Sequence, residues 1–282
     1  MAEFLRDGCT IHYELIGEGP MLVLTPGGRL GGEALRHVAE MLAGRFRVMI
    51  WDRRNTGRSS VWFGDQFEQL AWADDLAAML RDLGLGPAYL AGGSAGARVS
   101  YLTAVRQPDL VAGLALWTVS GGPYAGQVLG YLYHTPYIDA ALAGGMAAVA
   151  ATPFFKERIE ANPANEARLM AIAPERFVAV LRNWNASFYF DRAQPVLCAS
   201  EDDLRSISCP TLIVEGNDDV HTAEASTAVH ALVPHSQLIP CPWSREEWFD
   251  HVYGRSPGSP LALYPRVVPA IAEFLMGTKA FR

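Results

Sequence analysis

Residues 87–100 read Pro87-Ala88-Tyr89-Leu90-Ala91-Gly92-Gly93-Ser94-Ala95-Gly96-Ala97-Arg98-Val99-Ser100. The first part is a short apolar run that ends at a pair of glycines, as a buried strand does. A run compatible with a helix, residues 95–105, leads away from the serine. The pattern G-x-S-x-G over residues 92–96 therefore predicts a sharp strand-to-helix turn with Ser94 at its apex.

Such a turn is a nucleophile elbow, which projects a serine hydroxyl from the edge of the sheet. It needs glycines because the strand and the helix approach closely and the serine backbone is strained. The amide of Ala95, at the start of the helix, would point at the space above the Ser94 oxygen, where it could stabilise an oxyanion. The alternative is a glycine-rich turn whose serine only caps the helix.

The composition is that of a globular enzyme. The chain has 282 residues, of which 50% are hydrophobic and 19% are charged. This length can hold one large α/β domain with an inserted subdomain, and the apolar content excludes a disordered chain. The formal charge is −7, and no run of Lys or Arg occurs. Both facts argue against nucleic acid or an anionic membrane as the main partner.

The four cysteines are scattered, with no C-x-x-C pair. This spacing indicates free thiols in a reducing compartment, without a disulfide framework or a metal site. The N-terminal residues lack a basic segment followed by an apolar stretch, so no signal peptide is expected. Glycine or charge interrupts every apolar run, which predicts no membrane-spanning helix. We therefore expect a cytoplasmic protein.

Strands and helices alternate on both sides of the elbow. An alternating, half-exposed strand is expected over residues 9–15, and buried strands over 21–24, 46–51, 111–119, 210–214 and 236–239. Helical spacing covers residues 33–42, 69–83, 223–232 and 260–275. Buried strands that alternate with helices predict an α/β fold with a doubly wound, mostly parallel sheet.

The alternation stops over residues 123–199, where the sequence is helical, rich in alanine and aromatic, with expected breaks at Pro136, Gly144-Gly145, Pro153, Asn162-Pro163 and Pro174. We predict an inserted helical cap there, and a core made of residues 1–122 and 200–282. Most cap aromatics should pack on the sheet, while some, together with His134, should line an apolar substrate pocket. These aromatics are Tyr124, Tyr131, Tyr133, Tyr137, Phe154, Phe155, Trp184, Phe188 and Tyr189.

With these elements in this order, the chain resembles the α/β-hydrolase superfamily over essentially its whole length. The stretch at residues 52–59, D-R-R-N-T-G-R-S, is similar to the family turn D-x-R-G-x-G-x-S, with Asn55 where glycine is usual. Thr25-Pro26 stands where family members usually carry His-Gly. The resemblance implies that the amides of Gly27 or Gly28 supply the second half of an oxyanion hole.

The resemblance also implies a catalytic acid. Gly216-Asn217-Asp218-Asp219 is similar to the family turn G-x-x-D after the penultimate strand, whose last residue is the acid of the triad. This assigns the role to Asp219, with the neighbouring Asp218 as the second choice. The order of serine followed by acid is the order of this fold.

The histidine is less clearly marked. A triad needs an imidazole that takes the serine proton and is oriented by a carboxylate. The family histidine usually follows the last strand closely, but residues 240–244 contain none. His251, in the following loop, keeps the family order and is preferred. His221, two residues after Asp219, is the alternative, and its tight loop argues against its reaching Ser94. Four other histidines are expected to be solvated: His12, His37, His230 and His235.

We expect a cofactor-free and metal-free serine hydrolase that acts on a small or medium apolar carboxylic ester, lactone or related acyl compound. Ser94 would attack, a histidine would act as base and then acid, and Asp219 would orient it. One alternative is different chemistry on the same fold, such as C–C hydrolysis, a lyase reaction or cofactor-free oxygenation. Another is a ligand-binding protein without catalysis, which would show no covalent labelling of Ser94.

Overall fold

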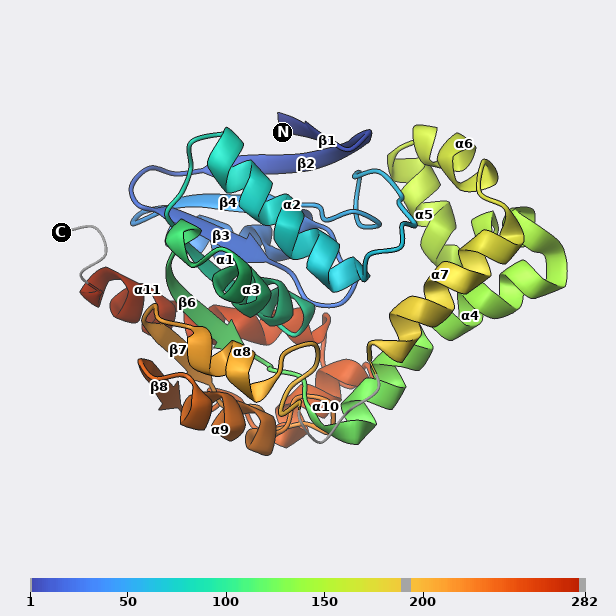
Figure 1. The fold of residues 1–282 in the computed structure, drawn as a ribbon. Coiled ribbons are helices and arrows are strands. Elements are labelled where there is room, and N and C mark those ends of the chain that lie inside the picture. Colours follow the sequence, from blue (N-terminus) through green and yellow to red (C-terminus); the bar gives the residue numbers. More distant parts are fainter. Residues whose placement is uncertain (1, 189–193, 279–282) are drawn as a thin grey trace.

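Eight strands form one sheet in the order β1-β2-β4-β3-β5-β6-β7-β8 (Figure 1). The computed structural model describes residues 2–188 and 194–278, so the predicted cap aromatic Tyr189 lies outside the described residues. The strands are β1 (Ala2–Arg6), β2 (Cys9–Ile16), β3 (Met21–Thr25), β4 (Arg47–Trp51), β5 (Ala88–Gly93), β6 (Val111–Trp117), β7 (Thr211–Val214) and β8 (Ser236–Ile239).

The sheet is parallel along the order β4-β3-β5-β6-β7-β8. Strand β2 pairs antiparallel with both of its neighbours, β1 and β4. Every residue of β3, β5 and β6 is buried, which explains why these strands are unbroken apolar runs in the sequence. The predicted doubly wound, mostly parallel sheet is confirmed. Strand β1 was not expected, and a turn with positive φ at Asp7 and Gly8 joins it to β2.

Helices cover both faces of the sheet, each over its own apolar layer (Figure 1). One face carries α2 (Glu68–Asp82), α3 (Ala95–Arg106), α8 (Glu201–Ser206) and α9 (Ala223–Leu232). The other carries α1 (Arg36–Leu42), α10 (Arg245–Val252) and α11 (Val268–Gly277). Three short 3₁₀ segments complete the core: η1 (Gly32–Leu35), η2 (Pro108–Leu110) and η3 (Pro260–Val267). The strand order places β5, and the elbow that follows it, near the middle of the sheet.

Two predicted helices differ in detail, and two helices of the core, α8 and α10, were not predicted. The helix expected over residues 33–42 begins as η1, and the one over 260–275 is η3 followed by α11. Helix α10 lies in a region expected to be a long loop. Its start is fixed by a capping box, in which the Ser244 hydroxyl accepts the Glu247 N–H and the Glu247 carboxylate accepts the Ser244 N–H.

Between β6 and β7 the chain forms a helical segment that stands out beside the sheet (Figure 1). It consists of α4 (Gly122–Ala150), α5 (Pro153–Ala161), α6 (Ala164–Met170) and α7 (Pro174–Ala186), with α7 packed along α4. The break expected at Pro136 is wrong, because α4 continues through it. A proline inside a helix costs about 3 kcal/mol, which the packing of α4 on α7 offsets. The kink lies instead at Gly144-Gly145, where Gly145 has φ 64°.

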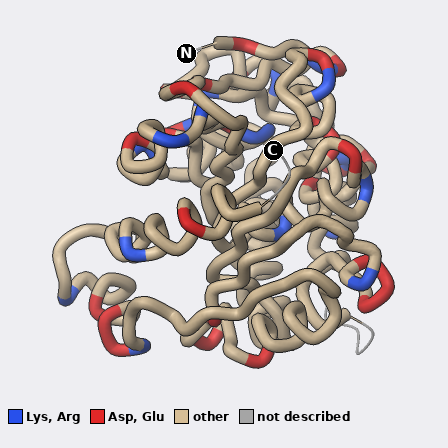
Figure 2. The backbone as a smooth tube through the Cα atoms, turned by 90° about the vertical axis from the view of Figure 1, so that its left-hand side faces the viewer, with Lys and Arg blue, Asp and Glu red and all other residues tan. Residues whose placement is uncertain are grey.

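One helical stretch among the described residues, Gly122–Ala161, is long and apolar enough to cross a membrane by length and composition, with a mean hydropathy of 1.4. The expectation that no stretch would qualify is therefore wrong on those criteria. Only 28% of its most apolar window is buried, so the stretch has one packed side and one open side. Elsewhere, acidic and basic residues are interspersed along the chain (Figure 2).

Candidate active site

The elbow is built as the glycine pattern requires. Ser94 lies between β5 and α3 with φ 54° and ψ −114°, and this strained geometry costs about 1–3 kcal/mol. Its N–H donates to the carbonyl oxygens of Trp117, at 3.2 Å, and Thr118, at 3.1 Å. A Cβ on Gly96 would collide with the Thr25 carbonyl oxygen, and one on Gly92 would lie 2.6 Å from the Gly96 carbonyl carbon. Only glycine lets the strands and the helix meet here.

The structure brings one imidazole and one carboxylate to the serine. His221 Nε2 lies 3.0 Å from Ser94 Oγ, and His221 Nδ1 lies 2.7 Å from Asp218 Oδ2. All three residues are buried, with exposed fractions of 8%, 9% and 6% for Ser94, His221 and Asp218. A proton on Nδ1 donates to the carboxylate and leaves the Nε2 lone pair to accept the serine hydroxyl. This arrangement can withdraw a proton from Ser94.

The turn after β7 holds the acid and the base together. Asp218 Oδ1 accepts the N–H groups of Val220, at 2.8 Å, and His221, at 2.9 Å, and so bends the chain back toward its own carboxylate. The N–H of Asp218 returns to the His221 carbonyl oxygen at 3.2 Å. From α10, the Trp248 ring stands edge-on to the imidazole, with 5.8 Å between centroids. Backbone and neighbouring ring together fix how the imidazole lies.

The protonation of Asp218 follows from its contacts. Burial alone would raise its pKa, but the hydrogen bond and charge of His221 and the backbone N–H groups of Val220 and His221 lower the pKa of Asp218 below its ordinary value. The carboxyl is therefore ionised near neutral pH, as an orienting acid must be to stabilise an imidazolium.

The preferred acid and base of the sequence analysis lie elsewhere. Asp219 is exposed, and its Oδ1 pairs with Arg245 Nη2 at 2.5 Å. His251 lies on α10, and its Nδ1 is 3.2 Å from the Gly258 carbonyl oxygen at the surface. The assignment to Asp219 and His251 is therefore corrected to the second choices, Asp218 and His221. The capped turn explains this, because it brings a residue three positions after the acid back onto it.

The predicted oxyanion residues flank the serine. Gly27 follows β3 and lies against the elbow, since a Cβ there would be 3.3 Å from Ser94 Cβ. Gly28 adopts φ 54°, a conformation that favours glycine. Ala95 is the first residue of α3, where a backbone N–H has no acceptor within the helix. Whether these amides bind an oxyanion stays a prediction.

His134 lies on the inner side of α4 and is completely buried. Its Nδ1 is 3.0 Å from the Gly130 carbonyl oxygen, and its ring lies 5.4 Å from that of Phe188 and 6.4 Å from that of Trp184. Burial, followed by the charge of Arg29, lowers the pKa of His134 to about 3. The ring is therefore neutral at physiological pH, with Nδ1 as the donor.

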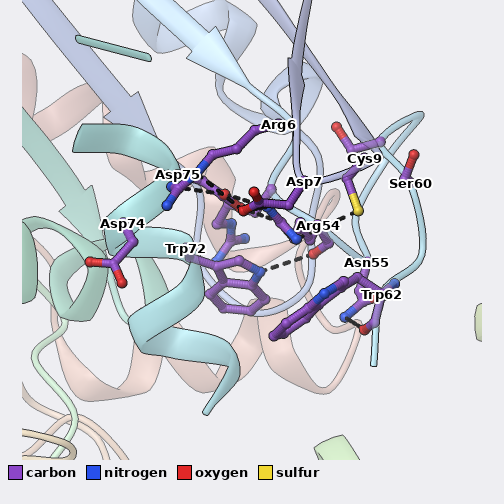
Figure 3. A network of polar contacts seen from close by, with 12 residues as sticks. Arg6, Asp7, Cys9, Arg54, Asn55, Ser60, Trp62, Trp72, Asp74 and Asp75 are labelled. Carbon is purple, nitrogen blue, oxygen red and sulfur yellow. Dashed lines mark hydrogen bonds and ion pairs between the residues drawn. The ribbon is translucent and has the colours of Figure 1, made fainter. Parts of the chain in front are cut away.

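The turn at residues 52–59 anchors the loops on this side of the sheet (Figure 3). Arg54 binds Asp75 through two nitrogens, at 2.7 and 2.8 Å, and its carbonyl oxygen accepts the Trp72 indole N–H at 3.0 Å. Asn55 has φ 64°, which asparagine tolerates where the family carries glycine. Its amide also donates to the Trp62 carbonyl oxygen at 3.0 Å and to Glu68 at 2.7 Å.

In the two described ranges, 2–188 and 194–278, no three His, Cys, Asp or Glu side chains are grouped so that they could hold a metal ion. The four cysteines are free thiols. Burial raises the pKa of Cys198 to about 12 and that of Cys209 to about 11. Both thiols are therefore protonated at neutral pH.

Comparisons with known proteins identify the fold. A family model described as "alpha/beta hydrolase fold" matches residues 20–192. A putative carbamate hydrolase RutD from Caulobacter sp. (strain K31) is 28% identical over 246 residues, which cover 83% of this chain and 86% of that protein. A thermophilic esterase from Thermogutta terrifontis, solved with malate bound, superposes with a TM-score of 0.63 at 25% identity, covering 98% of this chain and 97% of the esterase. The enol-lactonase from Burkholderia xenovorans LB400 superposes with a TM-score of 0.63 at 18% identity, covering 98% of this chain and 100% of the enol-lactonase. At this identity, the similarity is one of fold alone.

Proposed function

This chain belongs to the α/β-hydrolase family, and we propose that it is a serine hydrolase that cleaves a small or medium carboxylic ester, lactone or related acyl compound. The observation that carries the proposal is the pair of contacts of His221, 3.0 Å to Ser94 Oγ and 2.7 Å to Asp218 Oδ2. A serine, an imidazole and a carboxylate in that sequence of contacts are what acyl transfer by a nucleophilic serine requires.

In the first half-reaction, Ser94 Oγ attacks the carbonyl carbon while its proton passes to His221 Nε2. Asp218 holds the ring and stabilises the imidazolium that forms. The carbonyl oxygen becomes an oxyanion, which the amides of Ala95 and of Gly27 or Gly28 would bind. When the intermediate collapses, the carbon–oxygen bond to the leaving group breaks, and His221 gives its proton to the departing alkoxide.

In the second half-reaction, water attacks the acyl-enzyme. His221 takes a proton from the water, and the new oxyanion is held by the same amides. Collapse of the intermediate breaks the ester bond to Ser94, and the imidazolium returns a proton to Ser94 Oγ. The products are a carboxylic acid and an alcohol, or one hydroxy acid when the substrate is a lactone.

We further propose that the segment α4–α7 acts as the cap over this site. Tyr133 on α4 and Phe188, two residues after α7, contribute buried rings whose centroids are 5.7 Å apart. The similarity to putative carbamate hydrolases adds carbamates to the compounds to be screened beside esters and lactones.

The test is labelling with a fluorophosphonate probe followed by peptide mapping. We expect Ser94 to be labelled in the wild-type protein and in His251→Ala. Labelling should be lost in Ser94→Ala and reduced at least about 100-fold in His221→Ala, because the serine then has no base. His251→Ala is the matched control, since it removes the same group from α10.

Thermal unfolding of each variant serves to separate loss of the nucleophile from loss of the fold. A folded wild-type protein that the probe does not label would overturn the proposal, and it would favour chemistry without an acyl-enzyme or binding without catalysis. Loss of labelling in His251→Ala with retention in His221→Ala would overturn the assignment of the base.

A further inference from the structure

Three buried arginines lie on elements that adjoin the proposed nucleophile or the oxyanion glycines, and each has at least one nitrogen atom without a hydrogen-bond partner. They are Arg29, directly after the proposed oxyanion glycines, Arg53, after β4, and Arg98, on α3. The reaction steps above use none of them. A buried guanidinium is stable only when its charge and its N–H groups are satisfied, so each of these positions needs an explanation.

Arg98 is the one nearest the serine in sequence. It lies one helical turn after it, and its N–H donates to the Ser94 carbonyl oxygen at 3.1 Å. Its side chain is fully buried, with Nε bound to Gln69 Oε1 at 3.2 Å and Nη1 to Ser120 Oγ at 3.0 Å. The Nη2 atom has no partner, and no carboxylate in the described parts of the chain pairs with this guanidinium.

Arg53 is also fully buried. Its Nη2 donates to the carbonyl oxygens of Gly28, at 3.1 Å, and Leu30, at 3.0 Å, and its guanidinium stacks over Trp72 at 4.3 Å. Both Nε and Nη1 lack a partner, and no ion pair to Arg53 exists within residues 2–188 and 194–278. Burial lowers the pKa of Arg53 to about 10, which still leaves it charged at neutral pH.

Arg29 completes the group. Its Nη2 binds Glu68 Oε2 at 2.9 Å, while Nε and Nη1 have no partner. The guanidinium lies 5.2 Å from the centre of the Tyr133 ring on α4. The Phe188 ring lies 5.6 Å from the Arg98 guanidinium and packs against Tyr133. The arginines thus approach one pair of rings on the inner side of the helical segment.

The atoms without a partner in this group are all hydrogen-bond donors. Of the eleven buried side-chain nitrogen and oxygen atoms without a partner in the described chain, six belong to Arg29, Arg53, Arg98 and Gln69, and all six carry N–H groups. The only ion pair that these three arginines make within the described residues is that of Arg29 with Glu68. The group therefore has more positive charge and more donors than its neighbours satisfy, which calls for an anion with several acceptor oxygens.

We propose that the substrate of Ser94 carries a carboxylate besides the acyl group that is cleaved, and that Arg53 and Arg98, with Arg29 and Gln69, bind this carboxylate. This inference rests on the proposed function. It replaces the wholly apolar substrate expected from the aromatic composition of residues 123–199, because an apolar chain offers no acceptor to these donors. The rings of Tyr133 and Phe188 would contact the carbon chain between the two groups.

The first experiment compares half-esters with diesters of one series: monomethyl and dimethyl succinate, glutarate and adipate. We expect kcat/KM of the wild-type enzyme for the best half-ester to exceed that for its diester by about 10- to 100-fold, the range of hydrogen bonds to charged groups. Arg98→Met should abolish this preference, and Arg98→Lys, which keeps the charge, should restore part of it. The best chain length would measure the distance from Ser94 to the arginines.

Arg106→Met is the matched control. It makes the same substitution on the same helix, but at the surface, where Arg106 pairs with Asp74 at 2.8 Å. Its preference for the half-ester should equal that of the wild-type enzyme. An equal loss of preference in Arg106→Met and Arg98→Met would overturn the proposal, because a change in net charge alone would then explain the effect.

The second experiment needs no turnover. Glutarate should slow fluorophosphonate labelling of Ser94 in the wild-type protein and in Arg106→Met, but not in Arg98→Met. Absence of labelling in wild type would contradict the proposed function itself. Labelling that no member of the dicarboxylate series slows, together with hydrolysis that does not distinguish half-ester from diester, would overturn the carboxylate site alone. If Arg98→Met does not fold, the same comparison with Arg98→Lys decides, with weaker protection expected.

Discussion

Asp218 and Asp219 are adjacent in sequence but differ in burial and in their partners. Asp218 is buried and hydrogen-bonded to an imidazole, whereas the Asp219 side chain is 54% exposed and pairs with Arg245. A surface ion pair of this kind contributes little to the free energy of unfolding. A carboxylate that orients a catalytic imidazole, in contrast, strongly affects the rate of the reaction. The two residues therefore offer a matched pair of substitutions.

We predict that Asp218→Asn lowers kcat by about 10³- to 10⁴-fold, because an amide can favour the wrong tautomer of His221 and cannot stabilise the imidazolium. Asp219→Asn should change kcat less than about twofold, as an exposed pair would. Steady-state hydrolysis of the best ester at neutral pH measures both. Similar losses in the two variants would contradict the assignment of Asp218.

His134 gives a prediction for stability. Its pKa falls from 6.5 to about 3 on folding, so between these pH values the unfolded chain binds a proton that the folded chain does not. The stabilisation from the neutral ring is complete above pH 6.5 and is lost as the pH falls. Between pH 7.5 and pH 5, the wild-type protein should lose about 2 kcal/mol more stability than His134→Phe. Urea unfolding at both pH values tests this, and parallel losses would contradict it.

At the residue scale, the sequence marked Ser94 but ranked its partners in the wrong order, with Asp218 and His221 as second choices. The glycines around Ser94 have no other use than a close turn, so the motif was readable. Two adjacent carboxylates look alike in sequence, and only the hydrogen bonds of the turn, from Val220 and His221 to Asp218, separate them. The same turn makes His221 reach the serine, which residue spacing alone argued against.

Among the elements, the turn between β4 and α2 departs most clearly from the family pattern. Asn55 takes the positive φ that glycine usually supplies, and its side chain also binds three groups. The amide nitrogen donates to Trp62 and Glu68, while the amide oxygen accepts the Trp62 N–H at 2.7 Å. Asn55 therefore adds hydrogen bonds that join the turn to the following loop and to α2, which a glycine could not make.

We predict that Asn55→Gly, which restores the family residue, destabilises the protein by about 1–3 kcal/mol, because Glu68 and Trp62 lose buried partners. Asn55→Ala should cost more, since alanine loses the same bonds and is also strained at φ 64°. Denaturant unfolding ranks the three proteins. Asn55→Gly at or above wild-type stability would show that only the backbone conformation matters there.

Helix α10 is an element that the hydrophobic pattern of the sequence did not reveal. Its capping box, Ser244 with Glu247, is present in the sequence, but the eight-residue helix is too short for a clear apolar period. The family order favoured a histidine in this region. The structure instead uses the helix to bring Trp248 against the imidazole. Supporting residues of this kind carry no motif, because their role depends on packing alone.

For the molecule as a whole, one buried carboxylate joins three parts of the fold through two ion pairs (Figure 3). Asp75 on α2 binds Arg54 of the turn after β4 and, at 3.2 Å, Arg6 of β1. The Arg54 and Asp75 side chains are 3% and 1% exposed. Removing one member of such a pair leaves the other buried and charged.

We predict that Arg54→Met destabilises the protein by about 3–5 kcal/mol at neutral pH. Burial raises the pKa of Asp75 even with Arg54 present, so the carboxyl of the variant can take up a proton at acidic pH. A group with a raised folded pKa stabilises at low pH and loses that contribution as the pH rises, so the cost of the substitution should shrink on acidification. Arg106→Met, an exposed pair, should cost less than about 1 kcal/mol. An equal cost at all pH values would contradict the role given to Asp75.

The mostly parallel sheet and its two helical layers were predictable, because buried strands and amphipathic helices alternate with a clear period. The buried arginines were not. In the sequence, Arg98 lies in a helical run and Arg53 in a turn, and both look like ordinary surface residues. Their burial follows from long-range contacts, with Trp72 and Gln69 on α2 and with Phe188, which no local pattern encodes.

The proposed base and acid lie within one four-residue turn that is complete by residue 221. When the histidine follows the last strand, the reactive groups are spread over nearly the whole chain, and a genetic crossover near the end would separate them. Here a recombination event anywhere after residue 222 would pass on nucleophile, base and acid as one inherited unit. The last fifth of the chain then holds none of the three proposed reactive groups. Its sequence is constrained by packing alone, through strand β8, the layer of α10 and α11, and the contact of Trp248 with the imidazole.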